Sequence, residues 1–310
     1  MNINKAVLLA KVQAALGTDP TPTAILNAIL CENPEYDVID SKVERTNIKP
    51  SYGANRFAAI GEGQRIKFVT ELKGSGAAAT PPEIGVLFRG CGFTQTIDAT
   101  PGSESVSYDP HSDKDGEAIT IYYYLDAILH KIIDCRGTFS IDAPVNKYAK
   151  VTWEFTGIHA GPVAGELPTP TFNETVPPFV RAAEFAIDDY AAVIDGIKID
   201  IKNDIVKEPD LNAATGIKQW FIKERMVSGN IDPEVVALAT KDFWAMWEAC
   251  EAVPFAATIG QLTGNRCKIT GPAVQIDKPK YGNRENILTM GLPLVFTPGT
   301  VDDDISFKFD

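Results

Sequence analysis

The segment from Asp109 to Glu117 is the part of this sequence whose residue types come closest to a metal site. It matches part of a calcium-binding loop when His111 takes the first ligand position. The twelfth position would then be Tyr122, where a bidentate glutamate is needed. The segment therefore indicates a solvated charge cluster, which we treat as a candidate contact surface. Its candidate residues are Asp109, His111, Asp113, Asp115 and Glu117.

Other residues with chemical potential lack the partners that their chemistry needs. None of the three histidines has a second histidine at i+4 or a nearby cysteine pair. Gly61-Glu62-Gly63 lacks the third glycine of a dinucleotide-binding loop and precedes a strand. The run Asp302 to Asp304 could attract a divalent ion, but such exposed acidic runs are usually only solvated. The sequence predicts no catalytic residues, no cofactor and no metal site, and so no enzyme.

Charge and cysteine content restrict the class further. A formal net charge of −12 disfavours a protein that grips nucleic acid, because that affinity comes from clustered Lys and Arg. Five cysteines without a CxxC pair predict reduced thiols, two of them on buried helix faces. Lys5 and Lys11 interrupt the apolar start too early for a secretory signal, and no stretch approaches the ~20 apolar residues of a membrane span. These features predict synthesis in a cytoplasm.

Two predicted helices share one apolar spacing. Residues at i, i+3, i+4 and i+7 recur on one face of each, the period of a helix that packs on a core. In the first helix, within 82–91, they are Ile84, Leu87, Phe88 and Cys91. In the second helix, within 241–250, they are Phe243, Met246, Trp247 and Cys250. Both sets end on cysteine, which indicates that the chain contains one unit twice.

Strand patterns agree with a repeated unit. Ile141-Asp142-Ala143-Pro144 is echoed by Ile276-Asp277-Lys278-Pro279, and an apolar strand follows each, at 151–155 and 292–296. The alternation of residues 304–309 predicts an edge strand or a strand donated elsewhere. The polar segment 95–117 is an insertion or a long hairpin. The predicted class is α+β, mostly antiparallel β, as two tandem sandwich or barrel domains with one main helix each. The predicted divisions are an N-terminal arm (1–52), a first domain (53–165), a Pro-rich linker (166–180) and a second domain (181–310).

Ordered segments along most of the chain resemble the tail tube, or major tail, proteins of long-tailed bacteriophages. These segments are 8–11, 17–22, 43–45, 71–76, 87–93, 125–131, 137–141, 153–157, 167–170 and 239–243. No single motif is diagnostic, and the specificity comes from their order. The resemblance implies a structural virion protein whose β-rich domains close into rings that stack into a hollow tube and conduct DNA. It also implies a negative lumen, which would weaken adhesion of DNA to the wall.

Family members with one tube domain build six-fold rings, so two domains per chain predict a trimeric ring with a pseudo-hexameric outline. Ring-to-ring contacts are expected from the loop 95–117 and from the arm, including Pro20 and Pro22. The implied partners are other copies of the chain and other tail proteins, with assembly in the host cytoplasm. Alternatives are a tail terminator, a secretion-system tube component or, from another class, a β-sandwich binding module.

Overall fold

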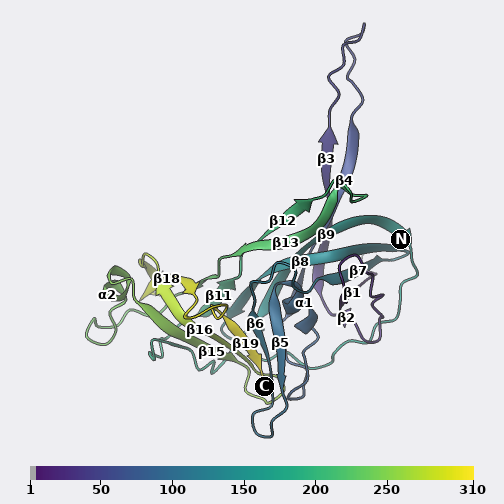
Figure 1. The fold of residues 1–310 in the computed structure, drawn as a ribbon. Coiled ribbons are helices and arrows are strands. Elements are labelled where there is room, and N and C mark those ends of the chain that lie inside the picture. The colour runs from purple at the N-terminus through teal and green to yellow at the C-terminus, as the bar shows by residue number, and fades with distance from the viewer. Residues whose placement is uncertain (1–4) are drawn as a thin grey trace.

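The computed structural model describes residues 5–310, which form nineteen strands and two short helices (Figure 1). The elements of the first half are β1 (Ala6–Val12), β2 (Ala28–Ile29), β3 (Glu32–Val43), β4 (Ala58–Glu71), α1 (Gly85–Gly90), β5 (Phe93–Asp98), β6 (Ser105–Pro110), β7 (Ile119–Leu125), β8 (Ile128–Pro144) and β9 (Lys150–Ala164). Those of the second half are β10 (Ala186–Ile187), β11 (Gly196–Asp200), β12 (Asn203–Pro209), β13 (Ile217–Arg225), β14 (Ser228–Ile231), α2 (Phe243–Glu248), β15 (Ala252–Ile259), β16 (Cys267–Ile276), β17 (Lys280–Arg284), β18 (Ile287–Thr297) and β19 (Ser306–Phe309). All the strand pairs described are antiparallel, so the predicted mostly antiparallel β class is confirmed.

The main sheet of the first half has the spatial order β1, β7, β8, β9, β4, β3. Its register follows from alternation, because every second residue of a strand faces the same side. Phe68 of β4 lies opposite Trp153 of β9, and Ile66 lies opposite Phe155. All four side chains are buried. The period-2 pattern predicted for 66–72 therefore sets which face of β4 enters the core.

Helix α1 packs its predicted apolar face against this sheet. Ile84, Leu87, Phe88 and Cys91 are all buried, as predicted. The Phe88 ring makes edge contacts with Phe139 and Trp153 at centroid distances of 5.1 and 5.2 Å. The ring of Phe307, from the last strand of the chain, lies 5.2 Å from Phe88. The first-half core is thus completed by the C-terminus of the chain.

The main sheet of the second half has the spatial order β10, β15, β16, β18, β14, β11. Position by position along the chain, these strands correspond to β1, β7, β8, β9, β4 and β3. Each helix also occupies the same place, after β4 or β14 and before β7 or β15. The two halves therefore share one strand order. They differ in β2 and the β5–β6 hairpin, which only the first half has, and in the separate β12–β13 hairpin, β17 and β19, which only the second half has.

Helix α2 differs from its prediction at its C-terminal end. Asp242 caps it by accepting hydrogen bonds from the backbone N–H of Trp244 (3.1 Å) and Ala245 (3.0 Å). Phe243 and Met246 are buried, but Trp247 is only partly buried. The prediction that Cys250 lies on the buried face is wrong, because the helix ends at residue 248 and Cys250 is exposed with φ of 51°. The matching cysteine at the end of each helix therefore has no common structural role.

Two strand pairs join the halves. β11 pairs with β8, and β19 lies between β16 and β6. The prediction that residues 304–309 form an edge strand is therefore wrong, because β19 has a partner on both sides, whereas the alternative prediction of a donated strand agrees with its pairing with β6 of the first half. The buried apolar residues of both halves form one continuous cluster. The sequence could not show this, since the contacts join residues about 55 positions apart between β8 and β11 and about 200 positions apart between β6 and β19.

The predicted N-terminal arm lies partly in the sheet. Residues 1–4 lie outside the described residues, but β1 pairs with β7 along its whole length, and Leu8, Leu9 and Ala10 are buried. The expectation that this segment stays outside the core is therefore wrong for β1. Its short apolar run finds a strand partner more than 100 residues later in the chain. The predicted domain limits themselves stay a prediction.

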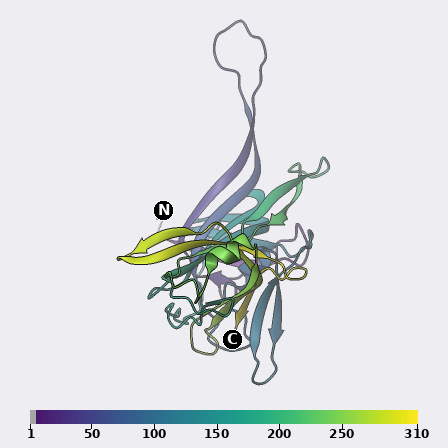
Figure 2. The same ribbon diagram turned by 90° about the vertical axis from the view of Figure 1, so that its left-hand side faces the viewer.

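Long hairpins extend from the sheets, some into solvent and one across the other half of the chain. The longest is β3–β4, which carries the loop 44–57 far from the body of the molecule (Figures 1 and 2). The β5–β6 hairpin occupies most of the predicted insertion 95–117. The β12–β13 hairpin lies across the first half and packs on β8 and β9. Among the described residues, neither helix is long enough to span a membrane.

Candidate assembly surfaces

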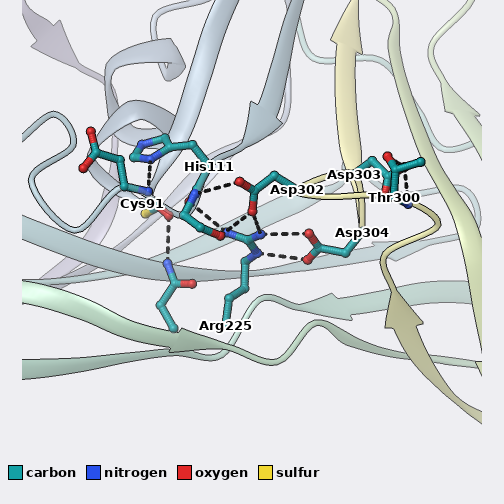
Figure 3. A network of polar contacts seen from close by, with 10 residues as sticks. Cys91, His111, Arg225, Thr300, Asp302, Asp303 and Asp304 are labelled. Atoms are coloured by element: carbon teal, nitrogen blue, oxygen red, sulfur yellow. Dashed lines mark hydrogen bonds and ion pairs between the residues drawn. The ribbon is translucent and has the colours of Figure 1, made fainter.

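A buried arginine lies where the two halves meet. Arg225, at the end of β13, donates two hydrogen bonds to the carboxylate of Asp304, at 2.9 and 2.8 Å (Figure 3). It also donates to the carbonyl oxygen of His111 at 3.3 Å and lies 3.5 Å from a carboxylate oxygen of Asp302. The side chains of Arg225 and Asp304 are 12% and 9% exposed. Such a bidentate pair satisfies both buried charges and fixes their orientation.

The acidic run 302–304 has structural partners throughout. The backbone N–H of Ser112 donates to Asp302 at 3.0 Å, and Asp303 accepts from the backbone N–H and the hydroxyl of Thr300 (Figure 3). Asp304 holds Arg225. The carboxylates of this run therefore form ion pairs with Arg225 and hydrogen bonds with Ser112 and Thr300. Within residues 5–310, no group of His, Cys, Asp and Glu is arranged to hold a metal ion.

The predicted contact residues of the loop 109–117 also bind within the chain. Asp109 accepts a hydrogen bond from the Ser306 hydroxyl at 2.6 Å, and Asp115 accepts from the Gln219 amide at 3.1 Å. Both partners belong to the second half. Asp113 accepts from the backbone N–H of residue 115 at 3.0 Å and so closes the turn. The loop thus connects the two halves of one chain, and its proposed role between rings stays a prediction.

Charge pairs extend this junction to the surface. Glu117 binds Arg89 of α1, with Arg89 Nε at 2.5 Å. Lys114 binds Glu208 of β12 at 2.9 Å, and hydrogen bonds from Gln219 and Lys114 lower the pKa of Glu208 to about 2. Burial lowers the pKa of His111, since the charged imidazolium would lose water contacts. The junction therefore favours an ionised Glu208 and a neutral His111.

The proline segment of the predicted arm lies on the outer face of β1 and β7. Pro22 is buried, and the carbonyl oxygen of Pro20 accepts a hydrogen bond from Lys11 Nζ at 2.9 Å. Asp19 binds the Tyr122 hydroxyl and lies 3.1 Å from Lys131 Nζ. The structure places Pro20 and Pro22, the two prolines of the predicted contact set, in this segment. A second, smaller apolar cluster beneath this segment anchors it to its own half.

The projecting β3–β4 hairpin is the surface that the sequence analysis missed. Its loop exposes Ile48 and Tyr52 completely, and Phe57 is 59% exposed. Large apolar side chains at an exposed tip are typical of a contact with another molecule. Residues 58–65 show no apolar alternation, so the sequence interpretation began this strand only at Ile66 and assigned residues 1–52 to an arm.

The fold and these surfaces define a class: an antiparallel β protein whose polar clusters stabilise its own junction while long hairpins reach into solvent. The chain belongs to the phage tail tube protein family, whose model matches residues 3–284. It is therefore a structural tail tube protein, and its place is the virion tail. A comparison with curated proteins found no match.

Proposed function

We propose that this protein forms rings that stack into the hollow tube of a phage tail and conduct DNA during ejection, without catalysis. The observation that carries this proposal is the common strand order of the two halves within a tail tube chain. One chain then supplies two blades of a ring. The proposed assembly takes place in the host cytoplasm, with other tail proteins as further partners.

The common strand order also supports a tandem duplication. Each half contains a six-stranded sheet with its helix in the same position of the chain. A duplicated unit explains why β8 and β16, and β9 and β18, have equivalent neighbours. We therefore keep the division into a first tube domain (53–165), a linker (166–180) and a second tube domain (181–310), and we add β1 to the first domain.

Three copies would close a pseudo-hexameric ring. Inside residues 5–310, β3 pairs only with β4 and β17 pairs only with β18. Open strand edges favour pairing with another chain, and a closed ring satisfies them without open-ended aggregation. Because each chain contributes two similar blades, three chains give six.

The β3–β4 hairpin is the proposed contact between successive rings. It extends well beyond the sheets, and its tip exposes Ile48, Tyr52 and Phe57. The net charge of −12 supports a lumen to which DNA does not adhere, because like charges weaken binding to phosphate. Charge reversal of carboxylates facing the lumen would then slow ejection and leave assembly intact.

Negative-stain electron microscopy of the purified protein tests this function. Rings of three copies with a six-fold outline, or stacked hollow tubes, are the expected result. A compact monomer at every concentration, including in the presence of tail initiator proteins, would contradict the proposal. Rings that never stack would instead favour a tail terminator.

A further inference from the structure

The loop of the β3–β4 hairpin has the opposite charge to the rest of the chain. Residues 44–57 contain three basic side chains, Arg45, Lys49 and Arg56, and one acidic side chain, Glu44, so their net charge is +2 in a chain with a net charge of −12. Arg45 and Arg56 are exposed and form no ion pair within residues 5–310, while Glu44 has a lysine partner on β3 at 3.2 Å. Because opposite charges complement each other across an interface, the acidic surface of another copy is a suitable partner for this loop.

The same loop presents apolar side chains on a closed backbone. Ile48 and Tyr52 are fully exposed, and Phe57 is 59% exposed. Two hydrogen bonds from side chains to carbonyl oxygens, at 2.6 and 3.0 Å, connect the two arms of the loop. Exposed apolar groups that are flanked by charged residues mark a contact with another molecule.

An apolar groove lies at the other end of β3 and is named here the base groove. Its volume is about 720 Å³, in the range of pockets that enclose a bound group. The residues of its lining that carry the argument are Leu30, Cys31, Pro34, Tyr36, Tyr123 and His130. β3 runs from the base groove to the loop over roughly 35 Å, at about 3.3 Å per residue. Figure 1 shows the loop at the top and β2, which also lines the groove, well below it.

The surroundings of the base groove are negatively charged. Among the described residues, its lining contains no lysine or arginine. Burial and the nearby carboxylates of Glu83 and Glu32 raise the pKa of Cys31 to about 12, and burial and Asp37 raise the pKa of Tyr36. Glu32 already pairs with a lysine at 2.6 Å, whereas Asp37 is exposed and forms no ion pair in the described part of the chain. The groove therefore favours an apolar group that carries positive charge at its edge.

Two buried polar atoms of the groove wall have no partner. The hydroxyl of Tyr36 and Nδ1 of His130 form no hydrogen bond with any described residue. The two rings lie against each other, with centroids 4.1 Å apart. Buried polar atoms normally have partners, so this wall is suited to a group that the single chain does not supply. The loop 44–57 contains hydroxyl and amide side chains, among them Asn47 and Ser51, that could supply it.

We propose that the loop 44–57 of one copy docks in the base groove of the next copy along the tube. This inference rests on the proposed stacking of rings and specifies the surface that receives the hairpin. Ile48 and Tyr52 enter the groove, and Arg45 and Arg56 lie at its negative edge. Because the loop and the groove lie at opposite ends of β3, the contact is head-to-tail and repeats from copy to copy.

Disulfide cross-linking tests this docking. Tyr52→Cys places a thiol on the loop, and Leu30→Cys places one in the groove lining, where Leu30 is 43% exposed. Both changes are made together with Cys31→Ser and Cys250→Ser, so that only buried native cysteines remain. A disulfide needs Cα atoms within about 7 Å, so the length of β3 excludes a bond within one chain. Under mild oxidation of assembled protein, we expect at least half of the chains in a ladder of covalent multimers on a non-reducing gel.

A matched control checks the site. Leu238, in the segment before α2, is 63% exposed and does not line the groove. Leu238→Cys in place of Leu30→Cys should give less than a tenth of the cross-linked product. Equal or greater cross-linking through Leu238→Cys would overturn the assignment of the base groove.

Charge reversal on the loop is an independent test. Arg45→Glu with Arg56→Glu should raise the concentration needed for tube assembly at least tenfold, measured by sedimentation and electron microscopy. Lys147→Glu with Lys268→Glu changes the net charge equally at two exposed positions and should assemble as wild type does. Thermal unfolding checks that each variant is folded.

The outcomes separate the docking site from the tube function. If wild type forms tubes but the Tyr52→Cys and Leu30→Cys pair gives no ladder, the docking site is wrong and the tube function stands. Unchanged assembly of the Arg45→Glu and Arg56→Glu variant would also contradict the docking. If wild type never assembles, the tube function fails and the docking fails with it.

Discussion

The β3–β4 hairpin and the β12–β13 hairpin occupy equivalent places in the two halves, yet only one of them is covered. The first hairpin is the outer part of the paired strands β3 and β4. The second hairpin connects the paired strands β11 and β14, which hold the same positions in the second half. β12–β13 folds across the first half, where Trp220 is 8% exposed and Gln219 is fully buried. Most side chains of β3 stay exposed. The same position in each half thus leads to a packed hairpin where the other half lies beneath it, and to a free hairpin where no other part of the chain lies beneath it.

This comparison shows what the free hairpin lacks. Lys207 of β12 even reaches Glu62 at the base of β4, at 2.6 Å, so the packed hairpin contacts the free one. A hairpin that is covered in one half and bare in the other indicates that the partner of the bare one comes from another molecule.

Shortening the free hairpin gives the largest expected effect. Replacing residues 44–57 by Asn-Gly, which forms a tight two-residue turn, removes the exposed tip and keeps β3 and β4 paired. We expect loss of tubes by electron microscopy with little change in the unfolding temperature, because the tip has few contacts within the chain. Normal tubes from this variant would show that stacking does not use the hairpin.

Breaking the junction ion pair is the next largest change. Arg225→Ala leaves Asp304 buried without its partner, and removing one member of such a pair costs about 3–5 kcal/mol of stability. Chemical denaturation measures this loss. Lys223→Ala is the matched control, since the Lys223–Asp204 pair is highly exposed and contributes at most about 1 kcal/mol. Equal losses in both variants would contradict a special role for Arg225.

Removing the anchor of the packed hairpin distinguishes the two hairpins directly. Trp220→Ala should cost about 3 kcal/mol, because it empties a buried site over the first half. Phe57→Ala on the free hairpin should leave the free energy of unfolding almost unchanged and weaken tube assembly instead. The comparison fails if Phe57→Ala destabilises the monomer as much as Trp220→Ala does.

The pH dependence of stability is the smallest expected effect. Burial lowers the pKa of both His111, under the packed hairpin, and His130, near the base of the free one. A lowered pKa means that the folded state disfavours the proton, so this stability is present above about pH 6.5 and is lost as the pH falls. We expect the unfolding temperature to fall between pH 8 and pH 5.5, and to fall less in His130→Phe. An identical slope in that variant would exclude His130 as a contributor.

Some elements of the fold could be predicted from the sequence and others could not, for physical reasons. The strands at 66–72, 119–125 and 197–201 and the buried face of α1 followed from local periodicity, since a half-buried element must repeat its apolar residues at its own period. Cys250 failed because the spacing cannot show where a helix ends, and α2 stops two residues before it. The loop 109–117 was found as a charged cluster, but its partners could not be, since Ser306 and Gln219 lie about 100 to 200 residues away in the chain.

Local patterns in the sequence predicted the antiparallel β class and the packing face of the first helix, and the order of short segments along the chain indicated the resemblance to tail tube proteins. These are local or ordered properties of the chain. Only the tertiary structure decided that β1 and β19 lie inside the sheets, that Arg225 and Asp304 join the halves, and that one of two equivalent hairpins stays free. Such features depend on which distant surfaces meet, and the free energy of those contacts is not encoded in any short stretch of residues.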